Sequence, residues 1–425
     1  MEVLKEKVKF QKYPAYKDSG IEWVGEAPNH WSVKKLKHIF FEKKKTTNTE
    51  LNCGSISFGK VVYKDDEKVT EATKSSYQEV LKGDFLINPL NLNYDLKSLR
   101  IALSKIDVVV SSGYIVLKSS IDLNKEYFNY LLHIFDVAYM KTLGSGVRQT
   151  LSFTHIANSE LLLPPIQEQT AIANFLDEKC GKIDAAIEQK QKLIELLKER
   201  KQIIVQNAVT KGLDPKVKMK DSGVEWIGEI PEHWLSISFR RISNLQQGLQ
   251  IAIDKRLEEP SSNALEYITT KSIHNPNNPK HYVIKPKENV ICDYQDILLG
   301  RTGNTGEVVT NVRGVFHNNF FKIVYDKKKI ERDFLVNYLN TQGIQKLIML
   351  SAGVTTIPDL NHGDFLSLPI VLPPLSEQKE IINYIEATSK RIEKAIGFQK
   401  KQIERLKEYK SSLIDTAVTG KIKIN

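Results

Sequence analysis

The residue types in two loops of this 425-residue chain are those that read DNA. Arg148 stands beside Gln149, and Arg301 is followed closely by Asn304. Arginine pairs with guanine edges in a major groove, and asparagine or glutamine pairs with adenine edges. A hydrogen bond within the loop, or a plain surface charge, is the alternative interpretation for each residue. The complete set of candidate DNA-binding residues is Arg148, Gln149, Lys271, Arg301, Asn304 and Arg313.

Motifs for catalysis and metal binding are incomplete. The glycine-rich stretch 300–306 resembles a phosphate-binding loop but lacks the Gly-Lys-Ser/Thr ending, so it predicts a strand-to-strand turn. The Asn-Pro-Leu-Asn run at 88–91 lacks the second proline and the aromatic residue of adenine methyltransferases. The nine histidines show no metal-binding spacing. We therefore predict no catalytic residue and no metal site.

Composition narrows the class of protein. Lys and Arg number 61 against 51 Asp and Glu, and this net charge of +10 suggests a polyanionic partner. No run of 18 apolar residues occurs, and the charged N-terminus has no signal-peptide core, which argues against a membrane span and secretion. Three widely spaced cysteines favour a reducing compartment. We expect a cytoplasmic protein.

The chain repeats two blocks of sequence. Residues 17–31 (KDSGIEWVGEAPNHW) and 220–234 (KDSGVEWIGEIPEHW) share eleven of fifteen positions. The second block is LPPIQEQ at 163–169 and LPPLSEQ at 372–378. The segments between the blocks show no comparable identity, so the layout is constant, variable, constant, twice over.

All four tryptophans lie in the first repeated block. Together with the outward faces of the long helices described next, they are our candidates for partner docking; burial in a core is the alternative. They are Trp23, Trp31, Trp226 and Trp234.

Each Leu-Pro-Pro motif opens a long amphipathic pattern. Steps of 3, 4 and 7 place the apolar residues on one stripe of a helix of about 42 residues. Glu168 and Glu377 lie where a helix N-terminus favours negative charge, and Gly212 and Gly420 are placed to end the helices. A narrow apolar seam with charged flanks is typical of a coiled coil. We expect the two helices to pair antiparallel with each other, the alternative being a partner on another chain. The stripes are Ile172, Leu176, Ile183, Ile187, Ile194, Leu197 and Ile204, and Ile381, Ile385, Ile392, Ile396, Ile403, Leu406 and Leu413.

The variable segments, about 41–160 and 244–369, are rich in β-branched and aromatic residues broken by Gly, Asn and Asp. Each then has a short helical stretch and a glycine-containing loop. We predict an α+β protein with two mixed α/β domains, two long helices between them and an internal pseudo-twofold repeat.

With both blocks occurring twice, the whole chain resembles the specificity (S) subunit of a type I restriction–modification system. The resemblance implies two target-recognition domains, each reading one half of a split site in double-stranded DNA, held by a helical spacer. It also implies a subunit without catalysis of its own. Two methyltransferase (M) and two restriction/translocase (R) subunits dock on it, and S-adenosylmethionine, ATP and Mg²⁺ belong to those partners.

On this interpretation the chain has four parts. They are a first recognition domain with the N-terminal conserved segment (1–160), a first spacer helix (161–215), a second recognition domain (216–369) and a second spacer helix (370–425). Because the variable segments are unrelated, the two half-sites should differ in sequence. Two other functions stay open: a free-standing enzyme acting on DNA, and a coiled-coil interaction protein that does not bind DNA.

Overall fold

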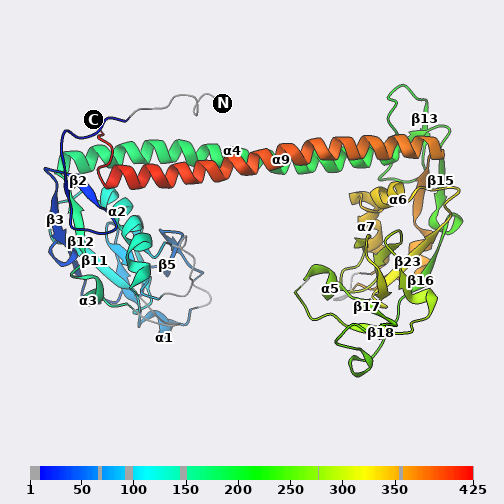
Figure 1. Cartoon of the computed structure of the whole chain (residues 1–425), viewed down its shortest axis with the longest axis horizontal. Coiled ribbons are helices and arrows are strands. Elements are labelled where there is room, and N and C mark those ends of the chain that lie inside the picture. Colours follow the sequence, from blue (N-terminus) through cyan, green and yellow to red (C-terminus); the bar gives the residue numbers. More distant parts are fainter. Residues whose placement is uncertain are drawn as a thin grey trace. The chain divides into compact units, whose positions relative to one another are not determined.

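The computed structural model describes residues 10–65, 69–90, 99–143, 151–275, 277–353 and 358–424. The chain divides into two compact units. Unit 1 comprises Met1–Lys190 with Lys401–Asn425, and unit 2 comprises Gln191–Lys400. Figure 1 labels many of their elements.

Each unit contains the same antiparallel β-hairpin, which the repeated Asp-Ser-Gly sequence builds. The Asp18 carboxylate accepts a hydrogen bond from the backbone N–H of Gly20 at 3.0 Å, and Asp221 does the same for Gly223 at 2.9 Å. Gly20 has φ +74° and Gly223 has φ +71°, a backbone region that only glycine adopts without cost. Identical turn chemistry therefore explains why this sequence occurs twice. The strands are β1 (Tyr16–Asp18), β2 (Glu26–Pro28), β13 (Met219–Asp221) and β14 (Glu229–Pro231).

Unit 1 is built on a four-stranded antiparallel sheet with a layer on each face. Phe85 and Ile87 of one central strand face a helix, while Leu86 between them faces a layer of short strands, as the alternation of a strand requires. The sheet order is β4 (Phe40–Glu42), β11 (Ile115–Ser119), β8 (Phe85–Ile87), β9 (Ile101–Leu103). The helix is α2 (Lys125–Ala138), and the other layer is β5 (Gly54–Ser57), β6 (Lys60–Tyr63), β7 (Gln78–Val80) and β10 (Val108–Val110).

Unit 2 has the same sheet topology, although its variable segment shares no obvious sequence with that of unit 1. In both sheets the first strand along the chain neighbours the last, which neighbours the second. Ile297 and Leu299 face the helices, and Leu298 faces a second four-stranded sheet. The first sheet is β16 (Ser243–Gln247), β23 (Phe320–Tyr325), β20 (Ile297–Gly300) and β21 (Val308–Val309). The helices are α6 (Arg332–Leu339), α7 (Gln342–Ser351) and α8 (His362–Ser367), and the second sheet is β18 (Tyr282–Ile284), β17 (Ala264–Ile268), β22 (Gly314–Phe316) and β19 (Ile291–Cys292).

A second strand pair joins the two constant blocks within each unit. In unit 1, β3 (Ser32–Lys35) pairs antiparallel with β12 (Glu160–Leu163). In unit 2, β15 (Leu235–Ser238) pairs with β24 (Pro369–Leu372). The strand that follows His-Trp therefore lies beside the strand that leads into Leu-Pro-Pro.

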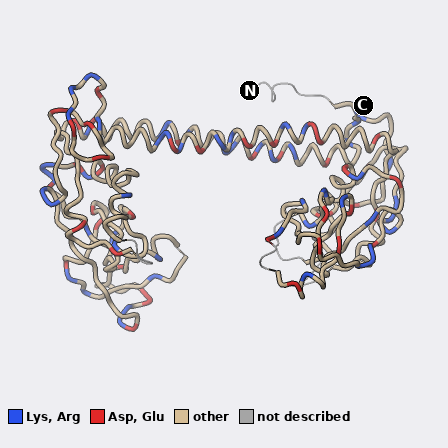
Figure 2. The backbone as a smooth tube through the Cα atoms, turned by 180° about the vertical axis from the view of Figure 1, so that it is seen from behind, with Lys and Arg blue, Asp and Glu red and all other residues tan. Residues whose placement is uncertain are grey.

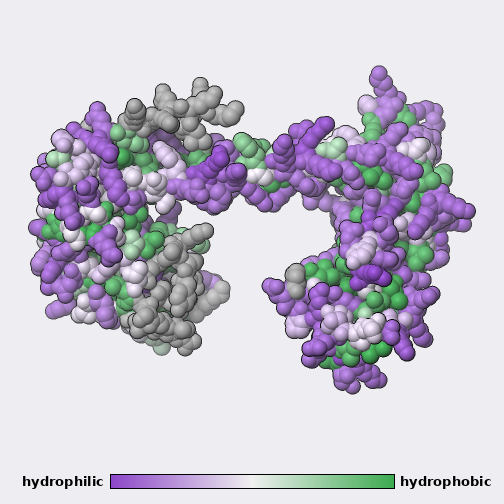
Figure 3. Space-filling view, in the orientation of Figure 1, coloured by the Kyte–Doolittle hydropathy of each residue, from purple (hydrophilic) through white to green (hydrophobic). Residues whose placement is uncertain are grey.

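The two predicted helices form, as α4 (Ile166–Lys211) and α9 (Leu375–Val418). They end where expected, because Gly212 and Gly420 follow with positive φ. Figure 2 shows charges of both signs along them, and Figure 3 shows that hydrophilic side chains cover much of their visible surface.

Within each unit the halves of α4 and α9 pack antiparallel. In unit 1, Ile172 and Leu176 at the start of α4 share a core with Ala417 at the end of α9, and Asp184 binds Lys410 at 2.7 Å. In unit 2, Lys201 binds Glu393 at 2.6 Å. These ion pairs are exposed and contribute little, so the apolar seam holds the helices together.

A helical glycine in α7 should tolerate no side chain. A Cβ at Gly343 would lie 1.9 Å from Cε3 of Trp226, whose ring packs on Tyr338. We expect Gly343→Ala to lower the free energy of unfolding of unit 2 by about 2 kcal/mol or more. The matched control is Gly397→Ala in α9, which meets nothing within 4 Å and should stabilise by up to about 1 kcal/mol. Urea denaturation measures both, and equal effects of the two variants would contradict the prediction.

A buried histidine should make unit 1 sensitive to acid. Burial lowers the pKa of His133 to about 4 although its Nε2 lies 2.9 Å from the carbonyl oxygen of Ile101. Below pH 6.5 His133 binds a proton in the unfolded chain but stays neutral in the folded chain. The free energy of unfolding therefore falls as the pH drops towards 4. Between pH 7.5 and pH 5 this effect lowers the free energy of unfolding by about 2 kcal/mol.

We expect His133→Gln to remove that part of the pH dependence, because glutamine can still donate to Ile101 but does not titrate. Denaturation at pH 7.5 and pH 5 measures it. Parallel losses in the variant and the unaltered protein would show that His133 is not responsible.

Candidate nucleic-acid interface

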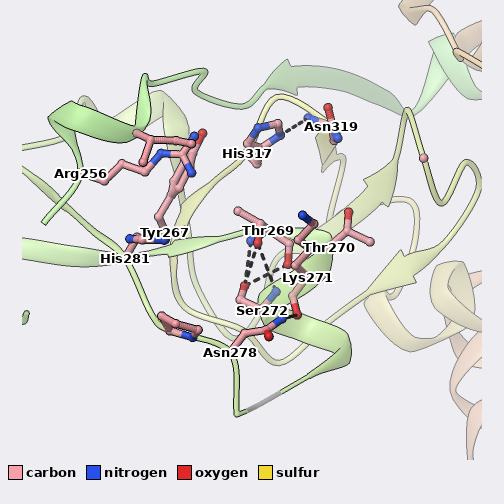
Figure 4. Close-up of a pocket in the computed structure, with 13 residues that line it drawn as sticks. Arg256, Tyr267, Thr269, Thr270, Lys271, Ser272, Asn278, His281, His317 and Asn319 are labelled. Carbon is pink, nitrogen blue, oxygen red and sulfur yellow. Dashed lines mark hydrogen bonds between the residues drawn. The ribbon is translucent and has the colours of Figure 1, made fainter. Parts of the chain in front are cut away.

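A cavity of about 620 Å³ lies in unit 2 beside the end of β17 and the short helix α5 (Thr270–His274). Figure 4 shows the polar side chains that surround it. We call it the basic cavity. The side chains that give it its charge and hydrogen-bonding groups include Arg256, Lys271, Ser272, Asn278, His281 and His317.

A capping box holds one wall of the basic cavity. The Thr269 hydroxyl accepts the N–H of Ser272 at 3.1 Å, and the Ser272 hydroxyl oxygen accepts the N–H of Thr269 at 2.9 Å. The Asn278 amide donates to the carbonyl oxygen of Lys271 at 3.1 Å. The Lys271 backbone is thus fixed while its side chain is exposed. Among the described residues no carboxylate forms an ion pair with its ammonium group, so it can bind an anion.

Arg256 and Tyr267 also line the basic cavity. The Nε and Nη2 of Arg256 donate to the carbonyl oxygen of Ile251 at 3.1 and 2.7 Å, and its guanidinium stacks 4.8 Å from the Tyr267 ring centre. Burial and then the charge of Arg256 lower the pKa of His317, so this imidazole is neutral at pH 7. Its Nδ1 accepts the N–H of Asn319 at 3.0 Å, which leaves Nε2–H as a donor. The basic cavity therefore combines positive charge with neutral donors, which suits phosphates and base edges.

The glycine-rich stretch 300–306 is a strand-to-strand turn, as predicted, because β20 and β21 pair across it. Gly303 of this turn lines the basic cavity, so the turn and Lys271 meet at one site. The two predicted DNA-binding residues of this turn, Arg301 and Asn304, form hydrogen bonds within the chain. Asn304 donates through its amide nitrogen towards His274 at 2.8 Å and to Glu307 at 3.1 Å.

The Arg301 donors that would form a bidentate contact with a base are already bound within the chain. Its Nε and Nη2 donate to the two carboxylate oxygens of Asp359 at 2.8 and 2.9 Å, and the guanidinium lies 5.7 Å from the Phe321 ring centre. The hydrogen bond from Arg301, and then that from Thr302, hold the pKa of Asp359 below its usual value. Arg301 therefore links the turn to the Asp359 segment, and its role in direct base contact stays a prediction.

The other predicted DNA-binding residues are not gathered at the basic cavity. Arg313 is exposed between β21 and β22 and does not line it. Arg148 and Gln149 lie outside the described residues. Sequence reasoning missed Arg256 and His317, since an isolated arginine and an isolated histidine in strand-rich sequence carry no motif.

The tryptophans divide into two pairs. Trp31 is 1% exposed and Trp234 is 0% exposed. The prediction that these two side chains dock a partner is therefore wrong, because neither is accessible at the surface. Their indole N–H groups donate to Glu168 Oε2 at 3.0 Å and Glu377 Oε2 at 2.9 Å. Glu168 and Glu377, which were predicted to lie at the helix N-termini, thus each bind the tryptophan of the other constant block in their unit.

Trp23 and Trp226 are half-buried. Trp23 packs on Phe135 and Trp226 packs on Tyr338, each against a helix of its own unit. They keep some exposed surface, so they remain compatible with a docking role.

The described part of the chain contains no group of three or more His, Cys, Asp or Glu side chains that could hold a metal ion. In the same part, no helix is both long and apolar enough to cross a bilayer.

The chain matches one protein family twice, over residues 28–198 and 245–405; the family is described as the type I restriction modification DNA specificity domain. The putative type I restriction enzyme MjaX specificity subunit of Methanocaldococcus jannaschii is 25% identical, over 94% of this chain and 96% of that protein. The EcoBI specificity subunit of Escherichia coli is 23% identical, over 70% and 66% of the two chains.

Two solved structures share the fold. One is a chain from a study of complex assembly and conformational transition in a type I R-M system, with a TM-score of 0.65, 16% identity and coverage of 92% of this chain and 98% of that one. The other is the HsdS subunit of Thermoanaerobacter tengcongensis, with a TM-score of 0.54, 15% identity and coverage of 93% and 98%. The resemblance found in the sequence is confirmed: the chain belongs to the type I restriction modification DNA specificity family and carries its domain twice.

Proposed function

We propose that this chain is the specificity subunit of a type I restriction–modification complex and that it recognises a split, asymmetric site in double-stranded DNA. Unit 1 reads one half-site and unit 2 reads the other. The observation that carries this proposal is the shared sheet topology of two units whose variable segments have unrelated sequences. One scaffold with two dissimilar surfaces is suited to two dissimilar half-sites, and joining them on one chain raises the effective concentration of the second contact.

The basic cavity is the proposed contact of unit 2 with its half-site. Lys271 supplies a charge that no carboxylate of the described residues pairs with, and the turn with Gly303 brings backbone close to the same place. Arg313 adds a phosphate contact outside the cavity. In unit 1 the proposed contacts are Arg148 and Gln149.

The chain is also proposed to act as a scaffold for two M and two R subunits in the cytoplasm. It binds no cofactor itself, since methyl transfer from S-adenosylmethionine and ATP-dependent cleavage with Mg²⁺ belong to those partners. Docking involves the outward faces of α4 and α9 and the exposed edges of Trp23 and Trp226. The relatives that are named specificity subunits support this role.

Selection from a random duplex library with the full chain and its M subunit tests the proposal. We expect two short fixed sequences, different from each other, on either side of an unread gap. Affinity should fall about a thousandfold between 50 and 200 mM salt for six phosphate contacts. Cutting or methyl transfer by the chain alone would favour a free-standing enzyme, and a salt-independent result without selection would favour an interaction protein.

A further inference from the structure

Unit 2 contains a second cavity, of about 340 Å³, at the start of α9. Its walls include Gly212, Pro231, His233, Glu377 and Ile381. We call it the Glu377 cavity. It shares no lining residue with the basic cavity, and its walls come from the constant blocks and the residues that flank them rather than from the variable segment.

The internal repeat shows what fills the corresponding place in unit 1. His30 and Glu168 correspond there to His233 and Glu377. The ring of Tyr13, which is 6% exposed, lies 5.4 Å from the His30 ring. Its hydroxyl donates to Glu168 Oε2 at 2.7 Å. A phenol therefore completes the site in unit 1.

The carboxylate in unit 2 has one hydrogen bond fewer. Glu168 Oε2 accepts both the indole N–H of Trp31 and the hydroxyl of Tyr13, whereas Glu377 Oε2 accepts the indole N–H of Trp234. Among the described contacts of unit 2 no hydroxyl reaches Glu377. A carboxylate oxygen has two lone pairs, so an acceptor position remains for a ligand in the cavity.

The rim of the Glu377 cavity is also less covered than its counterpart. In unit 1, Phe10 packs edge-on to Phe175 with ring centres 5.8 Å apart. The corresponding residues of unit 2 are Leu213 and Tyr384, which are 41% and 43% exposed. The equivalent segment of unit 2 is present and lines the cavity through Leu213, Asp214 and Val217, but it leaves Leu213 and Tyr384 partly exposed.

We propose that the Glu377 cavity binds the side chain of a tyrosine from a partner protein, presented on an extended segment with a basic neighbour. The carboxylates of Asp214, Glu377 and Glu380 outnumber the ammonium group of Lys211 in the cavity wall, so a basic segment is favoured. The segment that fills unit 1 has this character, since Lys12 precedes Tyr13. This proposal stands on the cavity and the repeat and does not require the proposed DNA function.

A labelled peptide with the sequence of residues 10–16, Phe-Gln-Lys-Tyr-Pro-Ala-Tyr, is a direct probe. By fluorescence anisotropy with the full chain we expect one peptide to bind per chain. Replacing its first tyrosine by phenylalanine should weaken binding about tenfold or more, because a hydrogen bond to a charged acceptor is lost. Glu380→Arg in the chain, which puts bulk and positive charge in the wall, should abolish binding.

Three results would overturn the proposal: no binding at millimolar peptide, equal binding of the phenylalanine peptide, or binding unchanged by Glu380→Arg. Deleting residues 1–13 supplies an independent check, since removing Tyr13 together with the segment that carries it opens the corresponding site of unit 1 and should raise the stoichiometry to two peptides per chain. A stoichiometry that stays at one contradicts the equivalence of the two sites. Sedimentation identifies the occupant, because a Glu380-dependent dimer of the unaltered chain would assign the cavity to a second copy instead of a partner.

Discussion

Trp234→Ala should lower the free energy of unfolding of unit 2 by about 4 kcal/mol. The indole is 0% exposed and its N–H donates to Glu377 Oε2 at 2.9 Å, so the substitution leaves a large void and removes a hydrogen bond to a charged group. The effect should concentrate in unit 2, because Trp234 packs in the core of that unit. Urea denaturation monitored by hydrogen exchange in each unit measures it.

Matched variants separate the contributions. Trp31→Ala should cause a similar loss in unit 1, since the residue is equally buried and is bound to Glu168. Trp234→Phe keeps most of the apolar volume but loses the hydrogen bond, and should cost about 1–3 kcal/mol. Trp23→Ala, at a half-buried position, should cost less than Trp31→Ala. A Trp234→Ala loss below about 1 kcal/mol would show that this residue does not hold the constant blocks together.

Lys271→Glu should weaken binding of the unit 2 half-site about 100-fold at low salt. Removing one contact to a base or phosphate costs about 1–3 kcal/mol, and reversing the charge adds repulsion from the DNA backbone. Binding is measured on duplexes in which one half-site at a time is scrambled. Scrambling the unit 2 half-site should affect the variant much less than the unaltered chain.

The control for this variant is Lys327→Glu, because Lys327 is an exposed lysine of the same unit that does not line the basic cavity. It makes the same change in net charge, so a local contact predicts a much smaller loss than for Lys271→Glu. Equal losses would reduce the role of Lys271 to the general attraction between a basic protein and DNA. Unaltered affinity in Lys271→Glu would place the half-site contact elsewhere on unit 2.

Much of the local structure could be predicted from the sequence because its signals lie close together along the chain. The stripe of seven apolar residues along each segment predicted the helices α4 and α9, and Gly212 and Gly420 predicted where they end. The glycine-rich stretch 300–306 was a turn because the residues of a phosphate-binding loop were missing from it. The duplicated blocks also determined that there are two equivalent units, since each block encodes its own hairpin or helix start.

Only the tertiary structure decided how those pieces meet. Glu168 binds an indole 137 residues earlier in the chain, and Arg301 binds a carboxylate 58 residues later. No short-range pattern encodes such pairings. Sheet order likewise depends on which strands bury one another's faces, and unrelated sequences satisfied that requirement in both units. The sequence alone thus determined the elements and their duplication. Packing decided which polar groups bind one another within the fold and which, such as Lys271, stay available for a ligand.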